Sequence, residues 1–114
     1  MTGVQTCALP IFLTLPRIIE AVDGKVPVLV DGSFRRGTDI IKALALGAKA
    51  VLVGRPVMWG LAAYGADGVQ GVLEMLQTEL GRYMAMCCKP TLAALDPSMV
   101  RVHGVRRPGA ATRG

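Results

Sequence analysis

The stretch that decides the fold runs from Val26 to Ala48 and reads VPVLVDGSFRRGTDIIKALALGA. It opens with a continuous apolar run, Val26–Val30, that is rich in β-branched residues. Such a run predicts a strand buried on both faces, as the strands of parallel sheets are. Pro27 fits among the first residues of this strand, where a missing backbone N–H is tolerated.

A helix and a second strand follow. Thr38 or Asp39 is placed to cap the helix, and Gly47 is placed to end it. Ala50–Val53 is a second short apolar run, broken by Gly54, and it predicts another buried strand. The order strand, loop, helix, strand is one βαβ unit with a right-handed crossover. The sequence therefore predicts an α/β fold with a parallel sheet.

Helices are predicted on both sides of this unit. Upstream, a helix spans 14–22, with Thr14 as its N-cap and Pro16 in its first turn. Downstream, Val57–Tyr64 is expected to form a short helix that Gly65 stops, and a longer helix follows. Its apolar positions follow the spacing of one buried stripe. They are Val69, Val72, Leu73, Leu76, Leu80, Tyr83, Met84 and Cys87.

Composition bounds the class of protein. The 114 residues are 52% hydrophobic and 18% charged, which allows one ordinary domain and excludes a disordered chain. No apolar window reaches the ~18 residues of a membrane span. Residues 1–100 hold nine basic and eight acidic side chains, so this part is not expected to bind polyanions. The remaining segment, 101–114, is predicted to be a solvated, disordered basic tail rather than a nucleic-acid-binding module.

The spacing of the cysteines and the composition of the N-terminal segment bear on the cellular location of the protein. Cys87 and Cys88 are adjacent, and none of the three cysteines has the spacing of a zinc site. The apolar run near the N-terminus has no basic segment before it, so it is a poor signal peptide. We therefore expect a cytoplasmic location and no metal.

Two loops carry the candidate chemistry, Asp31–Gly37 and Gly54–Pro56, and each follows a predicted strand. Glycine lets backbone N–H groups approach an anion, and the helix that follows presents unpaired donors. An arginine in each loop adds a planar fork suited to phosphate oxygens. A glycine and an arginine after one strand are also typical of a simple turn. Two such loops in tandem favour a phosphate site, as after strands seven and eight of (β/α)₈ barrels, with one of Arg35 and Arg36 facing the ligand.

These residues resemble the C-terminal signature of the FMN-dependent α-hydroxy-acid dehydrogenases and oxidases, the family of glycolate oxidase, lactate dehydrogenase and mandelate dehydrogenase. The likeness covers about residues 12–98, including Val53–Pro56 and Gly60–Gly65. It implies that residues 12–100 are the C-terminal portion of a (β/α)₈ TIM barrel, about the last two βα units and the C-terminal helix. It also implies that the ribityl phosphate of FMN binds to Asp31, Gly32, Ser33, Phe34, Arg35, Gly54 and Arg55. Ser33 departs from the family, which most often has glycine there.

The resemblance also says what this chain lacks. The family's histidine base and carboxylate-binding arginine belong to a His-Gly-Gly-Arg-Gln-type motif one barrel unit upstream, and nothing here matches it. The single histidine, His103, lies in the tail. The implied parent enzyme oxidises a small 2-hydroxy acid to a 2-oxo acid and is a homo-oligomer, with membrane association left open. This chain alone is expected to be inactive, with no catalytic residue of its own.

One alternative remains open at this level. Another phosphate-binding flavin or nucleotide barrel, an oxidoreductase or isomerase similar to inosinate dehydrogenase or isopentenyl isomerase, shares the pattern of Lys42–Ala48. Such enzymes lack the combined continuation through Gly54–Pro56 and Gly60–Ala63. Separately, residues 1–11 resemble a translated sequencing-adapter read, so we expect them to be non-native and leave them out of the fold prediction.

Overall fold

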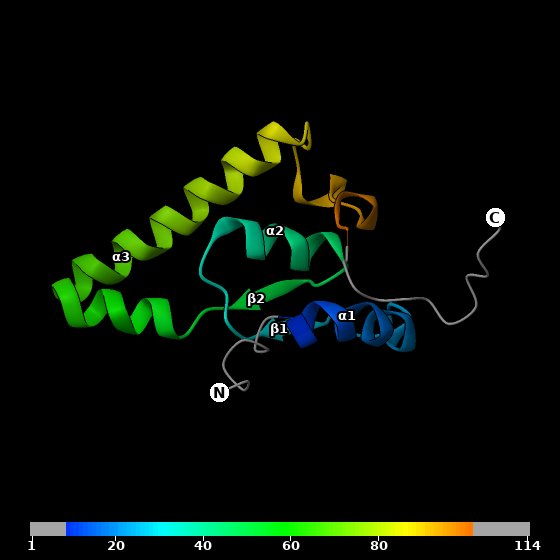
Figure 1. Cartoon of the computed structure of the whole chain (residues 1–114), viewed down its shortest axis with the longest axis horizontal. Coiled ribbons are helices and arrows are strands. Elements are labelled where there is room, and N and C mark those ends of the chain that lie inside the picture. The colour runs from blue at the N-terminus through cyan, green and yellow to red at the C-terminus, as the bar shows by residue number, and fades with distance from the viewer. Residues whose placement is uncertain (1–8, 102–114) are drawn as a thin grey trace, which may run out of the picture.

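The computed structural model of the protein describes residues 9–101 and has an α/β architecture built on two parallel strands. Leu29 lies opposite Ala50 and Asp31 opposite Leu52. A helix connects the strands, so the predicted βαβ unit is confirmed. In chain order the elements are α1 (Leu9–Val22), β1 (Leu29–Asp31), α2 (Gly37–Ala45), β2 (Ala50–Leu52) and α3 (Arg55–Met86), followed by two short 3-10 turns, Leu92–Ala94 and Pro97–Met99 (Figure 1).

The hydrophobic core lies between the helices and one face of this sheet. Val30 of β1 is buried, and its partner Val51 of β2 packs against the same cluster. Burial of these side chains is the main favourable contribution to the fold, at about 25 cal/mol per Å² of apolar surface. The other buried members of the cluster are Leu15, Phe34, Ile40, Ala43, Leu46, Ala48 and Leu76.

The other face of the sheet is uncovered. Leu29 is 56% exposed and Leu52 is 52% exposed. The prediction that both strands are buried on both faces is therefore wrong, because no segment within residues 9–101 covers this second face. β1 also begins later than predicted, at Leu29. The N–H of Lys49 still donates to the Val28 carbonyl at 2.8 Å, but Val26 and Pro27 lie outside the strand.

This open face leads to a prediction for the isolated 114-residue chain. An apolar sheet face left in water forgoes the stabilisation that its burial would give, and it favours association with other chains. We expect the dilute chain to show no cooperative heat-absorption peak in scanning calorimetry and to bind a dye that reports exposed apolar surface. A sharp transition that is independent of protein concentration would contradict this expectation.

The first helix starts earlier than the sequence suggests. α1 begins at Leu9, so Thr14 is not its N-cap, and Pro16 lies inside the helix rather than in the first turn. Pro10 takes the first-turn position instead, where proline needs no N–H partner. Ile11 is part of this helix and packs against the core, so the residues from Leu9 onward belong to the described fold. The proposed origin of residues 1–11 stays a prediction, and its first eight residues lie outside the described range.

The two predicted C-terminal helices form the two arms of α3. Tyr64 and Gly65 have non-helical backbone angles, and Gly65 adopts a φ of 60°, which glycine accommodates best. The predicted buried stripe is confirmed in part: Leu76 is buried and Val72 and Leu80 pack against the core. Leu73 and Cys87 are exposed, however, so the stripe is not buried along its whole length. No helix within residues 9–101 is long and apolar enough to cross a membrane.

The C-terminal segment folds back toward α2. The ammonium of Lys89 pairs with Asp96 at 2.6 Å, and the Ser98 N–H donates to the same carboxylate at 2.9 Å. These donors lower the pKa of Asp96 to about 2. Val100 then packs against the core. The predicted disordered tail, 101–114, lies outside the described residues except for Arg101.

Candidate phosphate-binding site

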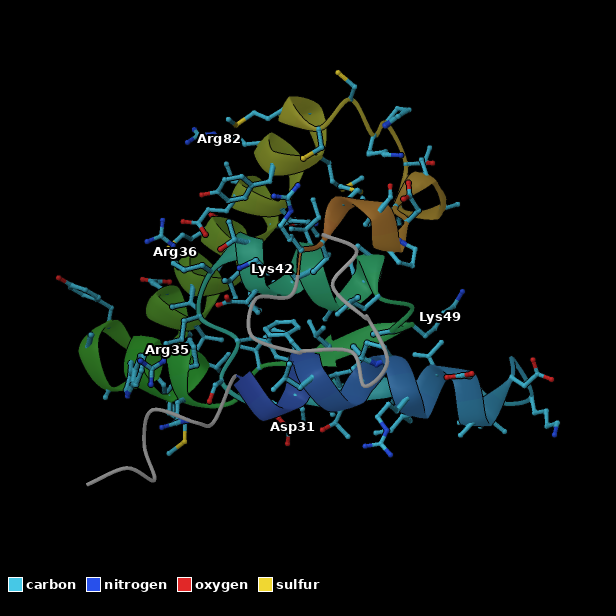
Figure 2. All side chains as sticks on the ribbon, turned by 45° about the vertical axis from the view of Figure 1, so that its right-hand side comes forward. Asp31, Arg35, Arg36, Lys42, Lys49 and Arg82 are labelled. Carbon is cyan, nitrogen blue, oxygen red and sulfur yellow. The ribbon has the colours of Figure 1, made fainter. Side chains whose placement is uncertain are left out.

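The loop after β1 leaves the strand through two unusual backbone conformations. Gly32 has a φ of 135°, and a Cβ built there would lie 2.5 Å from the Cδ1 atom of Ile11. Ser33 has a φ of 55°, a left-handed conformation that favours glycine. The family's preference for glycine at this position therefore has a local reason. Asp31, the last residue of β1, lies on the uncovered face of the sheet (Figure 2).

Phe34 anchors this loop to the core. Its side chain is 2% exposed and belongs to the core cluster with Val30 and Leu76. The aromatic ring is therefore not available to a ligand, and only the backbone of this residue can contribute to a site. Because the anchor lies in the middle of the loop, the residues on both sides of it are fixed relative to the sheet.

Arg36 and the start of α2 are occupied by carboxylates. Asp39 accepts hydrogen bonds from the backbone N–H groups of Arg35 and Arg36, both at 3.2 Å. Glu79 of α3 accepts from the Gly37 N–H at 2.7 Å and pairs with the Arg36 guanidinium at 2.8 Å. Contrary to expectation, the N–H groups of Arg35, Arg36 and Gly37 are therefore not unpaired, because two carboxylates accept from them. Asp39 binds these N–H groups from inside the helix, while the N-cap is Arg36.

The two neighbouring arginines point in different directions. Arg36 turns toward the second arm of α3 and Glu79, whereas Arg35 turns toward the first arm (Figure 2). There the Arg35 Cζ atom lies 5.3 Å from the centre of the Trp59 ring. Alternation predicted that one of the two arginines faces the ligand and the other faces solvent. Arg36 is paired with Glu79, whereas Arg35 forms no ion pair within residues 9–101.

The loop after β2 reaches back to the loop after β1. The Nη2 atom of Arg55 donates to the hydroxyl oxygen of Ser33 at 3.2 Å. Arg35 in turn reaches from the first loop to Trp59, four residues beyond Arg55. Each arginine thus contacts a residue of the other loop region. These crossed contacts link the two loops that leave the carboxyl ends of β1 and β2, with the Arg55 guanidinium at Ser33 and the Arg35 guanidinium over Trp59.

The start of α3 leaves room for a ligand. Gly54 is the N-cap, and a Cβ built at this position would meet nothing within 4 Å. Its carbonyl accepts from the N–H groups of Val57 and Met58, at 3.1 and 3.2 Å. A helix N-terminus carries a partial positive charge, which favours an anion in the space beside it. Pro56, buried in the first turn, removes one donor there.

The residues at this edge fit the phosphate of a nucleotide cofactor. Arg35 and Arg55 supply two charged forks, and neither forms an ion pair within residues 9–101. The Ser33 hydroxyl accepts from Arg55 and keeps its own proton to donate. Charge-assisted hydrogen bonds of this kind contribute about 1.5–3 kcal/mol each. The charge and the donors of these residues therefore fit a phosphate dianion.

A sequence model of the FMN-dependent dehydrogenase family matches residues 5–102. The chain belongs to this family. The match decides between the two classes of barrel that the sequence left open, in favour of the FMN-dependent dehydrogenases and oxidases. It includes both loops of the phosphate-binding edge.

Curated relatives and solved structures agree with this assignment. Human 2-hydroxyacid oxidase 1 is 55% identical over 87 residues, which are 76% of this chain and 24% of the relative. The L-lactate oxidase of Nostoc sp. is 54% identical over 88 residues, covering 77% and 24%. Among solved structures, an (S)-mandelate dehydrogenase superposes with a TM-score of 0.75 at 41% identity, covering 81% of this chain and 26% of that chain. A mandelate oxidase mutant with a monooxide FMN adduct gives 0.72 at 49% identity, covering 75% and 27%.

The chain spans about a quarter of the length of the curated relatives that it matches. Experiments on the whole fold therefore need a full-length protein. This FMN-dependent dehydrogenase sequence is similar enough to its relatives to replace the matching segment of one of them. Residues 12–100 can replace the matching quarter of human 2-hydroxyacid oxidase 1. This hybrid protein is called the chimera below.

Sequence reasoning missed two residues of the site region, Glu79 and Trp59. Glu79 contacts a residue far from it in the sequence, and Trp59 makes its contact through the face of its ring. Glu79 lies 43 residues beyond Arg36, so no local pattern links the two residues. Trp59 stands at an exposed helical position, and the only available signal was that the chain's one tryptophan follows the Gly54–Pro56 loop by three residues.

Glu79 gives a pH-dependent prediction for this loop. The Gly37 N–H and then Arg36 lower the pKa of Glu79 below its ordinary 4.5. Because the folded pKa is lowered, the contribution to stability is complete above pH 4.5 and is lost as the pH falls through the folded value. Glu79→Gln should mimic that loss at pH 7. We expect severalfold faster amide hydrogen exchange at Gly37 in the chimera.

Glu74→Gln is the matched control, since Glu74 lies on the same helix and bonds only to Gln70 in the described chain. It should leave the exchange of Gly37 unchanged. Equal exchange rates in the wild-type chimera and the Glu79→Gln variant would show that Glu79 does not fix the start of α2.

Proposed function

We propose that this chain is the C-terminal part of an FMN-dependent α-hydroxy-acid oxidoreductase with a (β/α)₈ barrel fold, comprising about the last two βα units and the C-terminal helix. In this proposal the two loops bind the ribityl phosphate of FMN. Membership of the FMN-dependent dehydrogenase family supports the cofactor. The single observation that carries the site is the pair of crossed contacts, Arg55 to Ser33 and Arg35 to Trp59.

Each predicted residue has a distinct part in this proposal. Arg35 and Arg55 neutralise the phosphate and donate to its oxygens, while Ser33 donates its hydroxyl proton. Gly54 leaves space beside the start of α3, and Gly32 allows the chain to turn against α1. Phe34 contributes through its backbone and through the anchoring of the loop. Asp31, on the uncovered face, points toward what would be the interior of a closed barrel.

Bound FMN supplies hydride acceptance, so that a 2-hydroxy acid is oxidised to a 2-oxo acid. The residues of this chain position the phosphate end of the cofactor and leave the substrate chemistry to the rest of the enzyme. The base and the carboxylate-binding arginine that the resemblance implies belong to the part of the relatives that this chain does not span.

The substrate class is proposed from the relatives, which are oxidases or dehydrogenases of 2-hydroxy acids, lactate and mandelate. We propose a small 2-hydroxy acid, because the common element of these substrates is a hydroxyl next to a carboxylate. A cytoplasmic location and a homo-oligomeric parent stay predictions.

The chimera tests the proposal directly. Purified chimera should be yellow, should carry FMN that resists gel filtration, and should oxidise a 2-hydroxy acid, whereas the 114-residue chain alone should show no turnover. The matched control is a chimera with Arg35→Ala and Arg55→Ala together, which should fold but elute without flavin. A colourless, folded wild-type chimera would contradict the proposed role of the two loops.

A further inference from the structure

Trp59 has an unusual environment for the only tryptophan of the chain. It lies on the first arm of α3 and is 52% exposed, so it is not a core residue. Its ring borders an open apolar groove of about 690 Å³ between the two arms of α3, which Arg35 also lines. The specific contact of the Trp59 indole is with the Arg35 guanidinium, whose Cζ atom lies 5.3 Å from the ring centre.

Arg35 differs from its neighbour in how its side chain is oriented. Arg36 is bound by the carboxylate of Glu79, which neutralises it. Within residues 9–101 the Arg35 guanidinium forms no ion pair with a carboxylate, and it lies against the indole face. An aromatic face attracts a guanidinium without cancelling its charge. A carboxylate at the same place would compete with a phosphate for the same N–H donors.

The indole also links the two loops. Trp59 follows β2, whereas Arg35 follows β1, so the direction of Arg35 depends on the position of the first arm of α3. The same arm begins at Arg55, the other arginine of the site. The contact with Trp59 therefore couples the direction of the Arg35 guanidinium to the helix arm that carries Arg55. Fixing donors before the ligand arrives reduces the entropy lost on binding.

We propose that Trp59 is a positioning residue of the phosphate site: it orients Arg35 toward the FMN phosphate through a cation–π contact while leaving the charge of Arg35 available. This inference rests on the proposed function. It assigns to Trp59 a role in cofactor affinity that requires no contact between the indole and FMN.

The test compares FMN with riboflavin, which has the same ring system but no phosphate. Apo-chimera carrying Trp59→Leu is titrated with each flavin, and binding is followed by flavin fluorescence. A cation–π contact at an exposed site corresponds to about a two- to fivefold change in affinity. We expect Trp59→Leu to weaken FMN by this factor and to leave riboflavin unchanged, while Trp59→Phe, which keeps an aromatic face, retains most of the FMN affinity.

A double-mutant comparison separates this inference from a general packing effect. In a chimera that already carries Arg35→Ala, Trp59→Leu should cause no further loss of FMN affinity. Equal losses for FMN and riboflavin, or a loss that persists in the Arg35→Ala background, would overturn the inference. If Trp59→Leu does not give folded protein, Trp59→Gln makes the same comparison on this half-exposed helix face.

The two proposals fail in distinguishable ways. If Arg35→Ala leaves the ratio of FMN to riboflavin affinity unchanged, the proposed phosphate site itself is wrong. If Arg35→Ala lowers that ratio but Trp59→Leu does not, the site stands and only the positioning role of Trp59 is overturned.

Discussion

Arg55→Ala in the chimera is expected to weaken FMN binding by about ten- to a hundredfold. The estimate follows from the loss of charge-assisted hydrogen bonds of about 1.5–3 kcal/mol, since each 1.4 kcal/mol is a factor of ten. The guanidinium of Arg55 contacts only a neutral hydroxyl, that of Ser33, among the described residues, so its charge is available to a phosphate. The measurement is a fluorescence titration of apo-chimera with FMN and, in parallel, with riboflavin.

Arg82→Ala is the matched control for this substitution. Arg82 lies on the second arm of α3, far along the helix from the two loops (Figure 2). The Arg82→Ala substitution removes the same charge from the protein but changes no residue at the carboxyl edge of the sheet, so FMN affinity should stay the same. A loss of similar size in both variants would mean that overall charge, rather than the site, governs binding. An unchanged FMN affinity in Arg55→Ala would remove this residue from the site.

Gly68→Ala is expected to have the largest effect on the fold. The two arms of α3 cross where Gly60 and Gly68 face each other, and a Cβ built on Gly60 would lie 2.5 Å from the Gly68 carbonyl oxygen. A Cβ on Gly68 would press into the backbone of Gly60 in the same way. Because backbone atoms rather than flexible side chains stand in the way, the arms must separate. We expect a loss of about 1–3 kcal/mol or more in the free energy of unfolding.

The same change should reach the phosphate site, because the first arm carries both Arg55 and Trp59. Thermal unfolding of the chimera and its FMN content after gel filtration measure the two effects together. Gly71→Ala is the control: it lies on the same arm, and a Cβ there would meet nothing within 4 Å. It should raise stability by about 0.5–1 kcal/mol, since alanine favours helix over glycine. Similar behaviour of the two variants would show that the arms do not pack at Gly60 and Gly68.

The local order of the fold could be predicted from the sequence because it depends on short patterns. Apolar runs at Val26–Val30 and Ala50–Val53 predicted two parallel strands, and the break at Gly65 predicted the two arms of α3. The exact ends were less predictable. α1 begins at Leu9 rather than at Thr14, because several apolar residues before Thr14 extend the helix.

The burial of the strands could not be read from their own residues. A continuous apolar run is typical of a strand covered on both faces, but what covers the second face is a property of other segments. Leu29 and Leu52 are exposed because no part of the described chain reaches them. In the proposed barrel, neighbouring strands would cover this face.

The predicted site residues stay a prediction, and the contacts among them could not be predicted from the sequence. Glycine and arginine after two successive strands indicated an anion site, and one of two adjacent arginines was expected to face it. The carboxylates that occupy the start of α2 come partly from Glu79, which lies 42 residues beyond Gly37. Only the folded chain shows that Arg36 is neutralised there and that Trp59 contacts Arg35.

The central claim is that two loops form one phosphate site, and a crystal structure of the chimera grown with FMN tests it most directly. We predict a single phosphate group within hydrogen-bonding distance of the guanidinium groups of both Arg35 and Arg55. A phosphate bound by only one of them, or cofactor bound with its phosphate away from this edge of the sheet, would contradict the claim.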